Sequence, residues 1–151
     1  MTTYLLDVNL LLALTDPMHI HHEPAHRWFA DKGQQAWATC PLTENGFIRI
    51  ASHPSYPNRP GGVTTVLGIF RRLSEAWGHH FWPEDISILQ ILEPDAVITL
   101  AQITDVYLLG LAVFKKGKLA TLDQRIPFPA VRGGRKALVL CQLCFARCTP
   151  L

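Results

Sequence analysis

The sequence predicts an α/β fold in which a mostly parallel central sheet of four to five strands is flanked by helices. At residues 4–14, YLLDVNLLLAL, a short apolar run meets an acid and a second, almost wholly apolar run follows at once. Such a segment must be covered by protein on both sides, as a central strand and the core helix that follows it are. The pattern of a buried strand ending on an acid returns at residues 118–126, KLATLDQRI.

The elements follow in order from periodicity and from start and stop signals. The first strand ends at Asp7 and a helix starts near Val8. Apolar residues at helical spacing predict a helix over 19–32, with Gly33 just past its end. A short strand at 36–39 precedes a helix over 41–52, since proline is favoured at the first helical position.

The second half of the chain continues the alternation. Helices are expected over 63–77, over 95–103 as a short piece after Pro94, and over 105–116 with Thr104 as the N-terminal cap. Strands are expected at 80–82, 118–122 and 137–140, the last after a basic loop at 131–136. The whole is expected to form a single domain, 1–151.

Composition fits a globular protein. Hydrophobic content of 48% and charged content of 17% exclude disorder, and no apolar run reaches the roughly 18 residues that a membrane span needs. The N-terminus lacks the basic start of a signal peptide, so we expect a cytoplasmic protein with no membrane association. Its four cysteines are expected to be thiols.

The charge is unevenly distributed. Residues 115–151 carry eight Lys or Arg against one acid, Asp123, for a net charge of +7, whereas residues 1–114 carry six bases and eleven acids, for −5. Bases gathered around one acid indicate an anionic partner, and a phosphate backbone is the obvious candidate. The alternative is a solvated surface that happens to be basic.

Four acids share one kind of position. Asp7 and Asp123 each end a strand, and Glu44 and Asp105 each lie near the start of a helix. In a parallel sheet with right-handed crossovers these positions lie at one edge, so the four carboxylates are expected to converge. Taken singly, Asp7 is explained as a helix cap and Glu44 by the helix dipole.

Converging carboxylates repel one another, which raises their pKa values or attracts a cation. Oxygen-only ligands of high charge suit Mg²⁺, or Mn²⁺, rather than zinc. Such an ion orients a water, lowers the pKa of that water and stabilises charge on a phosphate.

Four segments at these acids resemble the acidic motifs of PIN-domain ribonucleases, most closely the VapC toxins of bacterial VapBC toxin–antitoxin pairs; they are LLDVN, TENGFIRI, ITDVYLLGLA and LATLDQRI. The resemblance spans Tyr4 to Leu140. It implies a PIN-like fold, Mg²⁺-dependent endonucleolytic cleavage of RNA, and a homodimer inhibited by a cognate VapB-type antitoxin. It also implies that Asp7, Glu44, Asp105 and Asp123 are the metal-binding acids, with Asn9 and Thr121 as polar support.

Physical reasoning adds a division of roles. Asp7, Asp105 and Asp123 would hold the ion, while Glu44, with its longer side chain, would orient or deprotonate a metal-bound water. Phosphate contacts position a nucleic acid without specifying its sequence. The residues expected to make them are Arg125, Arg132, Arg135 and Lys136.

Other interpretations remain open. The same edge would also serve a non-cleaving PIN-like module that binds RNA or an antitoxin. A receiver-like phosphoacceptor domain also gathers acids at strand ends, but it needs an acid pair near the first strand, and Asn9 is not acidic.

Two further groups are potential metal ligands. Among four histidines at the start of the second helix, His22 and His26 share a face, but no carboxylate or cysteine nearby completes a set, so a polar helix face is preferred. Cys141, Cys144 and Cys148 suggest a metal or iron–sulfur site, with Cys40 as a distant fourth ligand. Their spacing equally fits one buried stripe of a helix, and we expect packing.

Overall fold

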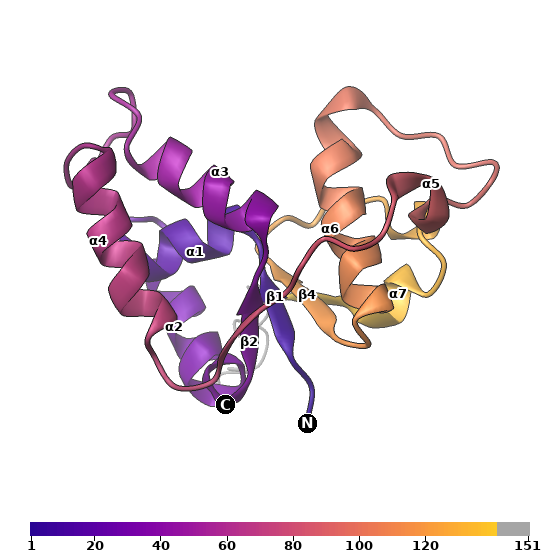
Figure 1. Ribbon diagram of the computed structural model, residues 1–151, viewed down its shortest axis with the longest axis horizontal. Coiled ribbons are helices and arrows are strands. Elements are labelled where there is room, and N and C mark those ends of the chain that lie inside the picture. The colour runs from indigo at the N-terminus through magenta and orange to yellow at the C-terminus, as the bar shows by residue number, and fades with distance from the viewer. Residues whose placement is uncertain (142–151) are drawn as a thin grey trace, which may run out of the picture.

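A computed structural model, which describes residues 1–141, shows a five-stranded sheet in which every pairing is parallel (Figure 1). The strand order is β3-β2-β1-β4-β5, so the first strand lies at the centre. The expected α/β fold with a parallel sheet is confirmed. The strands are β1 (Tyr4–Leu6), β2 (Trp37–Thr39), β3 (His79–Phe81), β4 (Lys118–Thr121) and β5 (Leu138–Leu140).

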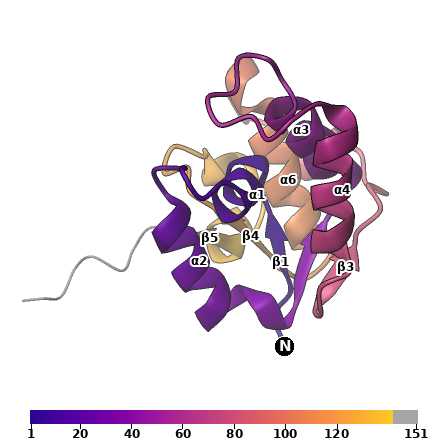
Figure 2. The same cartoon turned by 90° about the vertical axis from the view of Figure 1, so that its left-hand side faces the viewer.

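Helices cover both faces of the sheet. One layer holds α1 (Val8–Thr15), α2 (His22–Asp31), α3 (Pro41–Ala51) and α4 (Val63–Ser74), which lie in front of the strands in Figure 2. The other holds α5 (Ile88–Ile91), α6 (Ile103–Phe114) and α7 (Gly134–Ala137). Within residues 1–141, none of these helices is both long and apolar enough to cross a bilayer.

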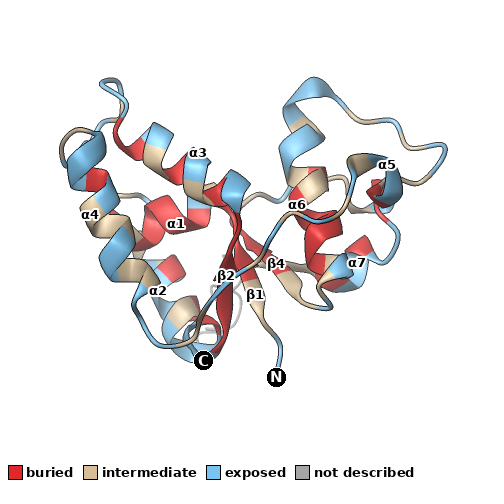
Figure 3. Cartoon of the chain, in the orientation of Figure 1, coloured by how far each residue is buried: buried red, intermediate tan, exposed pale blue. Residues whose placement is uncertain are grey.

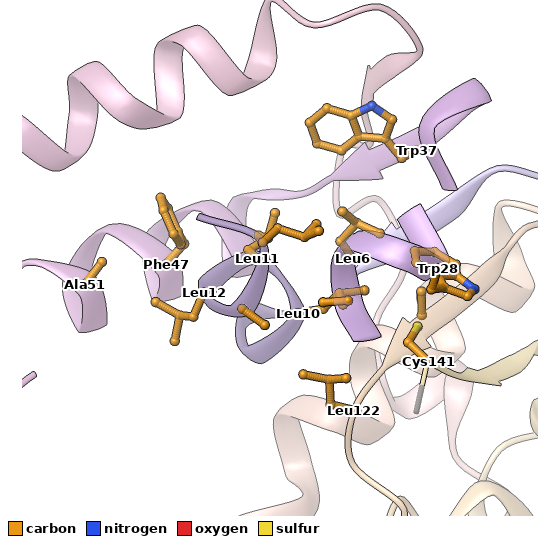
Figure 4. Close-up of a cluster of buried hydrophobic side chains, with 14 of the residues drawn as sticks. Leu6, Leu10, Leu11, Leu12, Trp28, Trp37, Phe47, Ala51, Leu122 and Cys141 are labelled. Carbon is orange, nitrogen blue, oxygen red and sulfur yellow. The ribbon is translucent and has the colours of Figure 1, made fainter. Parts of the chain in front are cut away.

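Alternating side chains of the strands build two cores. Leu6, Trp37 and Ala120 join the cluster under α1 to α4, part of which is drawn in Figure 4. Their neighbours Leu5 and Leu119 join the cluster under α5 and α6. Since successive strand residues point to opposite faces, strands of only three or four residues contribute side chains to both layers. The three inner strands β1, β2 and β4 are accordingly mostly buried, while the helices expose their outer faces (Figure 3).

The winding of the chain creates one switch point. From β1 the chain moves outward through β2 to β3, then returns to β4 on the other side of β1 and continues to β5 at that edge. The crossovers therefore leave β1 and β4 in opposite directions. In open α/β sheets, ligands bind beyond the carboxyl ends of the strands at such a point.

Close contact between α1 and α3 depends on Gly46. A Cβ atom built there would lie 2.7 Å from Cγ2 of Val8, which is too short for a real contact. The absent side chain lets the start of α3 approach the start of α1. Both helices begin at the carboxyl edge of the sheet, and this packing fixes their relative position there.

The expected helix over 95–103 is wrong. Residues 95–99 form no helix, and only a single 3-10 turn, Leu100–Gln102, precedes α6. Val97 and Leu100 are 93% and 88% exposed, so the segment has no core against which to pack a helical face.

Some element boundaries also differ. The 3-10 turn runs directly into α6, which begins at Ile103 with Gln102 as its N-cap, so Thr104 is a first-turn residue and not the expected cap. The second helix begins at His22 and not at His19. The ring Nδ1 of His19 accepts a hydrogen bond from the backbone N–H of His21 at 3.1 Å, which holds the preceding residues in a turn.

The cysteines within the described part of the chain lie apart. Cys40 packs under α6, whereas Cys141 packs with the cluster under α1 and α2, on the other face of the sheet. Burial raises the pKa of the Cys40 thiol to about 11 and that of Cys141 to about 12. These two behave as buried apolar residues, while Cys144 and Cys148 lie outside residues 1–141.

Candidate active site at the carboxyl edge

Asp7 occupies the junction between the central strand and the first core helix. Its Oδ1 accepts a hydrogen bond from the backbone N–H of Leu10 at 2.8 Å, so the residue caps α1. Its Oδ2 accepts a hydrogen bond from the hydroxyl of Thr121. The residue is only 4% exposed, and no Lys or Arg among residues 1–141 forms an ion pair with it, which is unusual for a buried acid. Capping thus explains one oxygen of Asp7, and the burial needs a further reason.

Thr121 links the ends of the two central strands. Its hydroxyl donates to Asp7 after β1 and accepts from the backbone N–H of Asp123 after β4, at 3.0 Å. The side chain is fully buried. Thr121, which the sequence analysis expected as polar support, therefore contacts the carboxylate of Asp7 and the backbone of Asp123.

Asp123 lies two residues beyond the end of β4. Its Oδ1 accepts hydrogen bonds from the backbone N–H of Arg125 at 2.8 Å and from Nε of Arg125 at 3.4 Å. The Asp123 side chain is 25% exposed and that of Arg125 is 91% exposed. An oriented, partly exposed carboxylate is thus paired with a cation that reaches into solvent.

Three of the four acids influence one another. Burial raises the pKa of Asp7 to about 6; the hydrogen bonds from Thr121 and Leu10 oppose this rise, and the charges of Asp105 and Asp123 add to it. The pKa of Asp105 is also raised, first by burial and then by the charge of Asp123. Asp105 lies in the first turn of α6. The charges of two acids at strand ends, Asp7 and Asp123, and of one acid at a helix start therefore act on one another.

Glu44 is placed at the same edge but not within this group. It lies in the first turn of α3, which begins at Pro41 directly beyond β2. Burial alone raises its pKa, and neither Asp7 nor Asp123 contributes to the shift. The side chain is half-buried and has a longer reach than the three aspartates.

The chemistry of these donors suits a hard divalent cation, but they are not assembled as a finished coordination shell. Within residues 1–141, no three or more histidine, cysteine, aspartate or glutamate side chains form a ready metal site. Asp105, Asp123 and Glu44 are all partly exposed, so their carboxylates have room to turn toward an ion. Asp7, held by two hydrogen bonds, is the fixed member.

The four expected phosphate-binding bases lie at different distances from this edge. Arg125 contacts Asp123 directly, and Nε of Arg132 lies 3.3 Å from Oε1 of Glu93. Arg135 and Lys136 are exposed on α7, immediately before β5. Because all strands run parallel, the start of β5 lies toward the edge of the sheet opposite the acids.

Beside Asp123 lies an open pocket of about 480 Å³. Asn9, expected as polar support, is exposed and lines it. The other lining residues are His19, His21, Leu122, Asp123, Gln124 and Arg125.

The histidines of this region divide into two pairs. Nδ1 of His22 donates to the carbonyl of Ala13 at 2.7 Å, and Nε2 of His26 donates to that of Leu14 at 2.8 Å, so this pair fastens α2 to the end of α1. His19 and His21 instead face the pocket. Sequence reasoning missed this second pair, because its members were assigned to a helix that begins only at His22.

The chain is similar over most of its length to several named proteins, although no family model matches it. It is 40% identical over 134 residues to "Ribonuclease VapC44" of Mycobacterium tuberculosis, an alignment that covers 87% of this chain and 94% of the relative. "Ribonuclease VapC39" of the same organism is 36% identical over 133 residues, covering 87% of this chain and 96% of the relative.

Two solved structures share the fold. The Mycobacterium tuberculosis toxin VapC20, described as cleaving the sarcin–ricin loop, has a TM-score of 0.55 at 11% identity and covers 85% of this chain and 96% of its own. A chain of VapBC2 from Rickettsia felis, bound to a DNA fragment from their promoter, has a TM-score of 0.52 at 12% identity and covers 83% and 93%.

The structural neighbours establish the architecture alone, whereas the relatives at 36–40% identity align along nearly their whole length. The chain therefore belongs to the VapC family of PIN-domain ribonucleases.

Proposed function

We propose that this protein is a Mg²⁺-dependent endoribonuclease, the toxin of a type II toxin–antitoxin pair, and that it hydrolyses RNA phosphodiester bonds at its carboxylate edge. The observation that carries the proposal is the burial of Asp7 in the field of Asp105 and Asp123 at the switch point of the sheet. A buried charge with like charges beside it destabilises the fold unless a cation compensates it. The names of the VapC relatives support the ribonuclease activity.

The ion would be held by Asp7, Asp105 and Asp123. Carboxylate oxygens without histidine or thiolate favour Mg²⁺, with Mn²⁺ as a substitute. When bound, the ion supplies Lewis-acid stabilisation of the phosphate and lowers the pKa of a coordinated water. Thr121 would keep Asp7 in place through its hydrogen bond, as residues behind metal ligands generally do.

Glu44 would orient the attacking water or accept its proton. Its pKa is raised by burial, which brings a carboxylate closer to the range useful for a general base. Its position in the first turn of α3, outside the group of three aspartates, leaves it free for this role. Asn9, exposed on the first turn of α1, would give polar support near the substrate.

RNA would lie over the carboxyl edge of the sheet with its phosphates near the arginine and lysine side chains. Arg125 is the nearest candidate because it already pairs with Asp123. Arg132 pairs with Glu93 and would have to leave that carboxylate to bind a phosphate. Arg135 and Lys136 would contact a more distant part of the strand.

A cognate VapB-type antitoxin and a homodimer complete the proposal. The similarity to VapBC2 of Rickettsia felis, a toxin–antitoxin structure, supports the first of these. The alternative is a module that binds RNA or antitoxin without cutting. RNA cleavage assays with Mg²⁺ or Mn²⁺ separate the two.

Asp7→Asn should abolish RNA cleavage while leaving the fold intact. The amide oxygen can still accept from the backbone N–H of Leu10, and the amide N–H can donate to the hydroxyl oxygen of Thr121, but the charge that holds the ion is lost. Excess EDTA should abolish wild-type cleavage equally. The matched control is Asp31→Asn, at the exposed end of α2, which should cut at the wild-type rate. Circular dichroism checks the fold, and full wild-type activity in EDTA would contradict the metal requirement.

Thr121→Val should lower RNA cleavage and metal affinity by roughly 10- to 100-fold, the usual effect of losing a residue that orients a metal ligand. Thr121→Ser keeps the hydroxyl and should restore most of the loss. Valine keeps the shape of threonine without its hydroxyl, whereas serine keeps the hydroxyl without the methyl group. A larger loss in Thr121→Val than in Thr121→Ser therefore traces the effect to the hydroxyl and its hydrogen bonds with Asp7 and Asp123. Equal activity of the two variants would show that the hydroxyl plays no part.

Charge reversal at Arg132 and Arg135 should weaken RNA binding and reduce its salt dependence. Each lost phosphate contact should lower the slope of log K against log salt by about 0.7 for single-stranded RNA. Binding is measured with the Asp7→Asn variant so that RNA stays intact. Arg72→Glu, on the exposed surface of α4, makes the same charge change as a control. An unchanged slope would remove Arg132 and Arg135 from the interface.

A further inference from the structure

The pocket beside Asp123 is continuous with the carboxylate edge. One wall is the segment 122–125 that follows β4, and the other carries His19 and His21 from the connection between α1 and α2. We call this space the histidine pocket; it is lined by Asn9, His19, His21, Leu122, Asp123, Gln124 and Arg125. Its volume of about 480 Å³ lies within the range of roughly 300–1,000 Å³ typical of small-ligand sites.

The wall that carries the histidines is fixed in place. The carbonyl of Asp16 accepts from the backbone N–H of His19 at 3.0 Å, and the carbonyl of His19 accepts from that of His22 at 3.0 Å. The carboxylate of Asp16 is itself buried and accepts hydrogen bonds from the hydroxyl of Tyr56 at 2.7 Å and from Asn58 at 3.0 Å. The pocket is thus preorganised rather than formed by a loose loop.

The two imidazole rings provide aromatic surface and directed hydrogen bonds. Their centroids lie 5.8 Å apart at an interplanar angle of 46°. Since Nδ1 of His19 accepts from the backbone N–H of His21, the neutral His19 ring carries its proton on Nε2. Burial lowers the pKa of His19, which favours this neutral form. An uncharged aromatic donor suits a nucleobase better than a phosphate.

The facing wall complements the rest of a nucleotide. Gln124 brings an amide, with both donor and acceptor atoms, and Arg125 brings the one arginine or lysine among the lining residues. Asp123, shared with the carboxylate edge, places the pocket directly beside the proposed point of cleavage. Proteins that read RNA by sequence bind unstacked bases against aromatic side chains, histidine included, and hydrogen-bond their edges.

We propose that the histidine pocket receives one nucleotide of the RNA next to the bond that is cut, and that His19 and His21 help to select its base. This inference rests on the proposed ribonuclease function. The base stacks against the imidazole rings and contacts Gln124, while Arg125 holds the attached phosphate. The two histidines are specificity-determining residues and take no part in the chemical step.

The direct test is binding of each of the four nucleoside 5′-monophosphates in EDTA, where no cleavage takes place. Imidazole NMR signals of His19 and His21 should shift with at least one nucleotide, while those of His80, exposed on the edge strand β3, should not. His19→Ala and His21→Ala should each weaken that binding roughly tenfold, the scale of one lost base-stacking contact. Gln124→Ala, on the opposite wall, should weaken it too, which excludes local collapse of the histidine segment as the cause.

Cleavage of a randomised single-stranded RNA tests the functional part. Wild type should show a base preference at one position beside the cut, and His19→Ala and His21→Ala should lose it, with a larger change in KM than in kcat. His80→Ala should keep the wild-type pattern.

The two proposals fail separately. Nucleotide binding in the pocket without any RNA cleavage in Mg²⁺ or Mn²⁺ would overturn the ribonuclease and leave a binding pocket. RNA cleavage whose pattern is unchanged in both histidine variants, with no nucleotide shifting the imidazole signals, would overturn the pocket alone. Shifts caused by a polyglutamate peptide but by no nucleotide would assign the pocket to a protein partner and would also overturn it.

Discussion

The hydrogen bond between Thr121 and Asp7 is the contact on which the site depends. It joins residues 114 positions apart, across the ends of β1 and β4. The pairing of these strands at the centre of the sheet brings a buried carboxylate, a buried hydroxyl and the backbone of Asp123 together. Burial and the neighbouring acids make ionised Asp7 unfavourable, as its raised pKa of about 6 shows. The fold thus holds a charge in a place where it destabilises the protein, which is characteristic of functional sites.

Much of this arrangement could be predicted from local sequence. A buried strand followed by an acid occurs at Asp7 and again at Asp123, and each pattern alone indicates a carboxyl edge. Because the crossovers between parallel strands are right-handed, the helix that begins near Asp105 is expected to start at the same edge. These inferences succeed because the positions of strand ends and helix starts in a parallel sheet follow from topology, without knowledge of individual contacts.

What the sequence could not provide depends on tertiary contacts. Arg135 and Lys136 precede β5, and the parallel pairing of β5 with β4 places them toward the edge opposite the acids; no local pattern shows how β5 pairs. Val97 and Leu100 follow a helical pattern but meet no core, so no helix forms there. His19 and His21 face a pocket because a turn precedes α2, and that turn is recognisable only from its own hydrogen bonds.

The most direct test of the central claim is the free energy of unfolding of wild type and Asp7→Asn at pH 8, with and without Mg²⁺. Folding raises the pKa of Asp7 from 3.8 to about 6, so the free energy of unfolding falls as the pH rises through that interval and Asp7 loses its proton. At pH 8 the metal-free wild type should therefore be less stable than Asp7→Asn by on the order of 1–3 kcal/mol. Adding Mg²⁺ should stabilise the wild type and leave the variant nearly unchanged. If the metal-free variant is the less stable protein, or if Mg²⁺ stabilises both equally, Asp7 is not a carboxylate held for a cation.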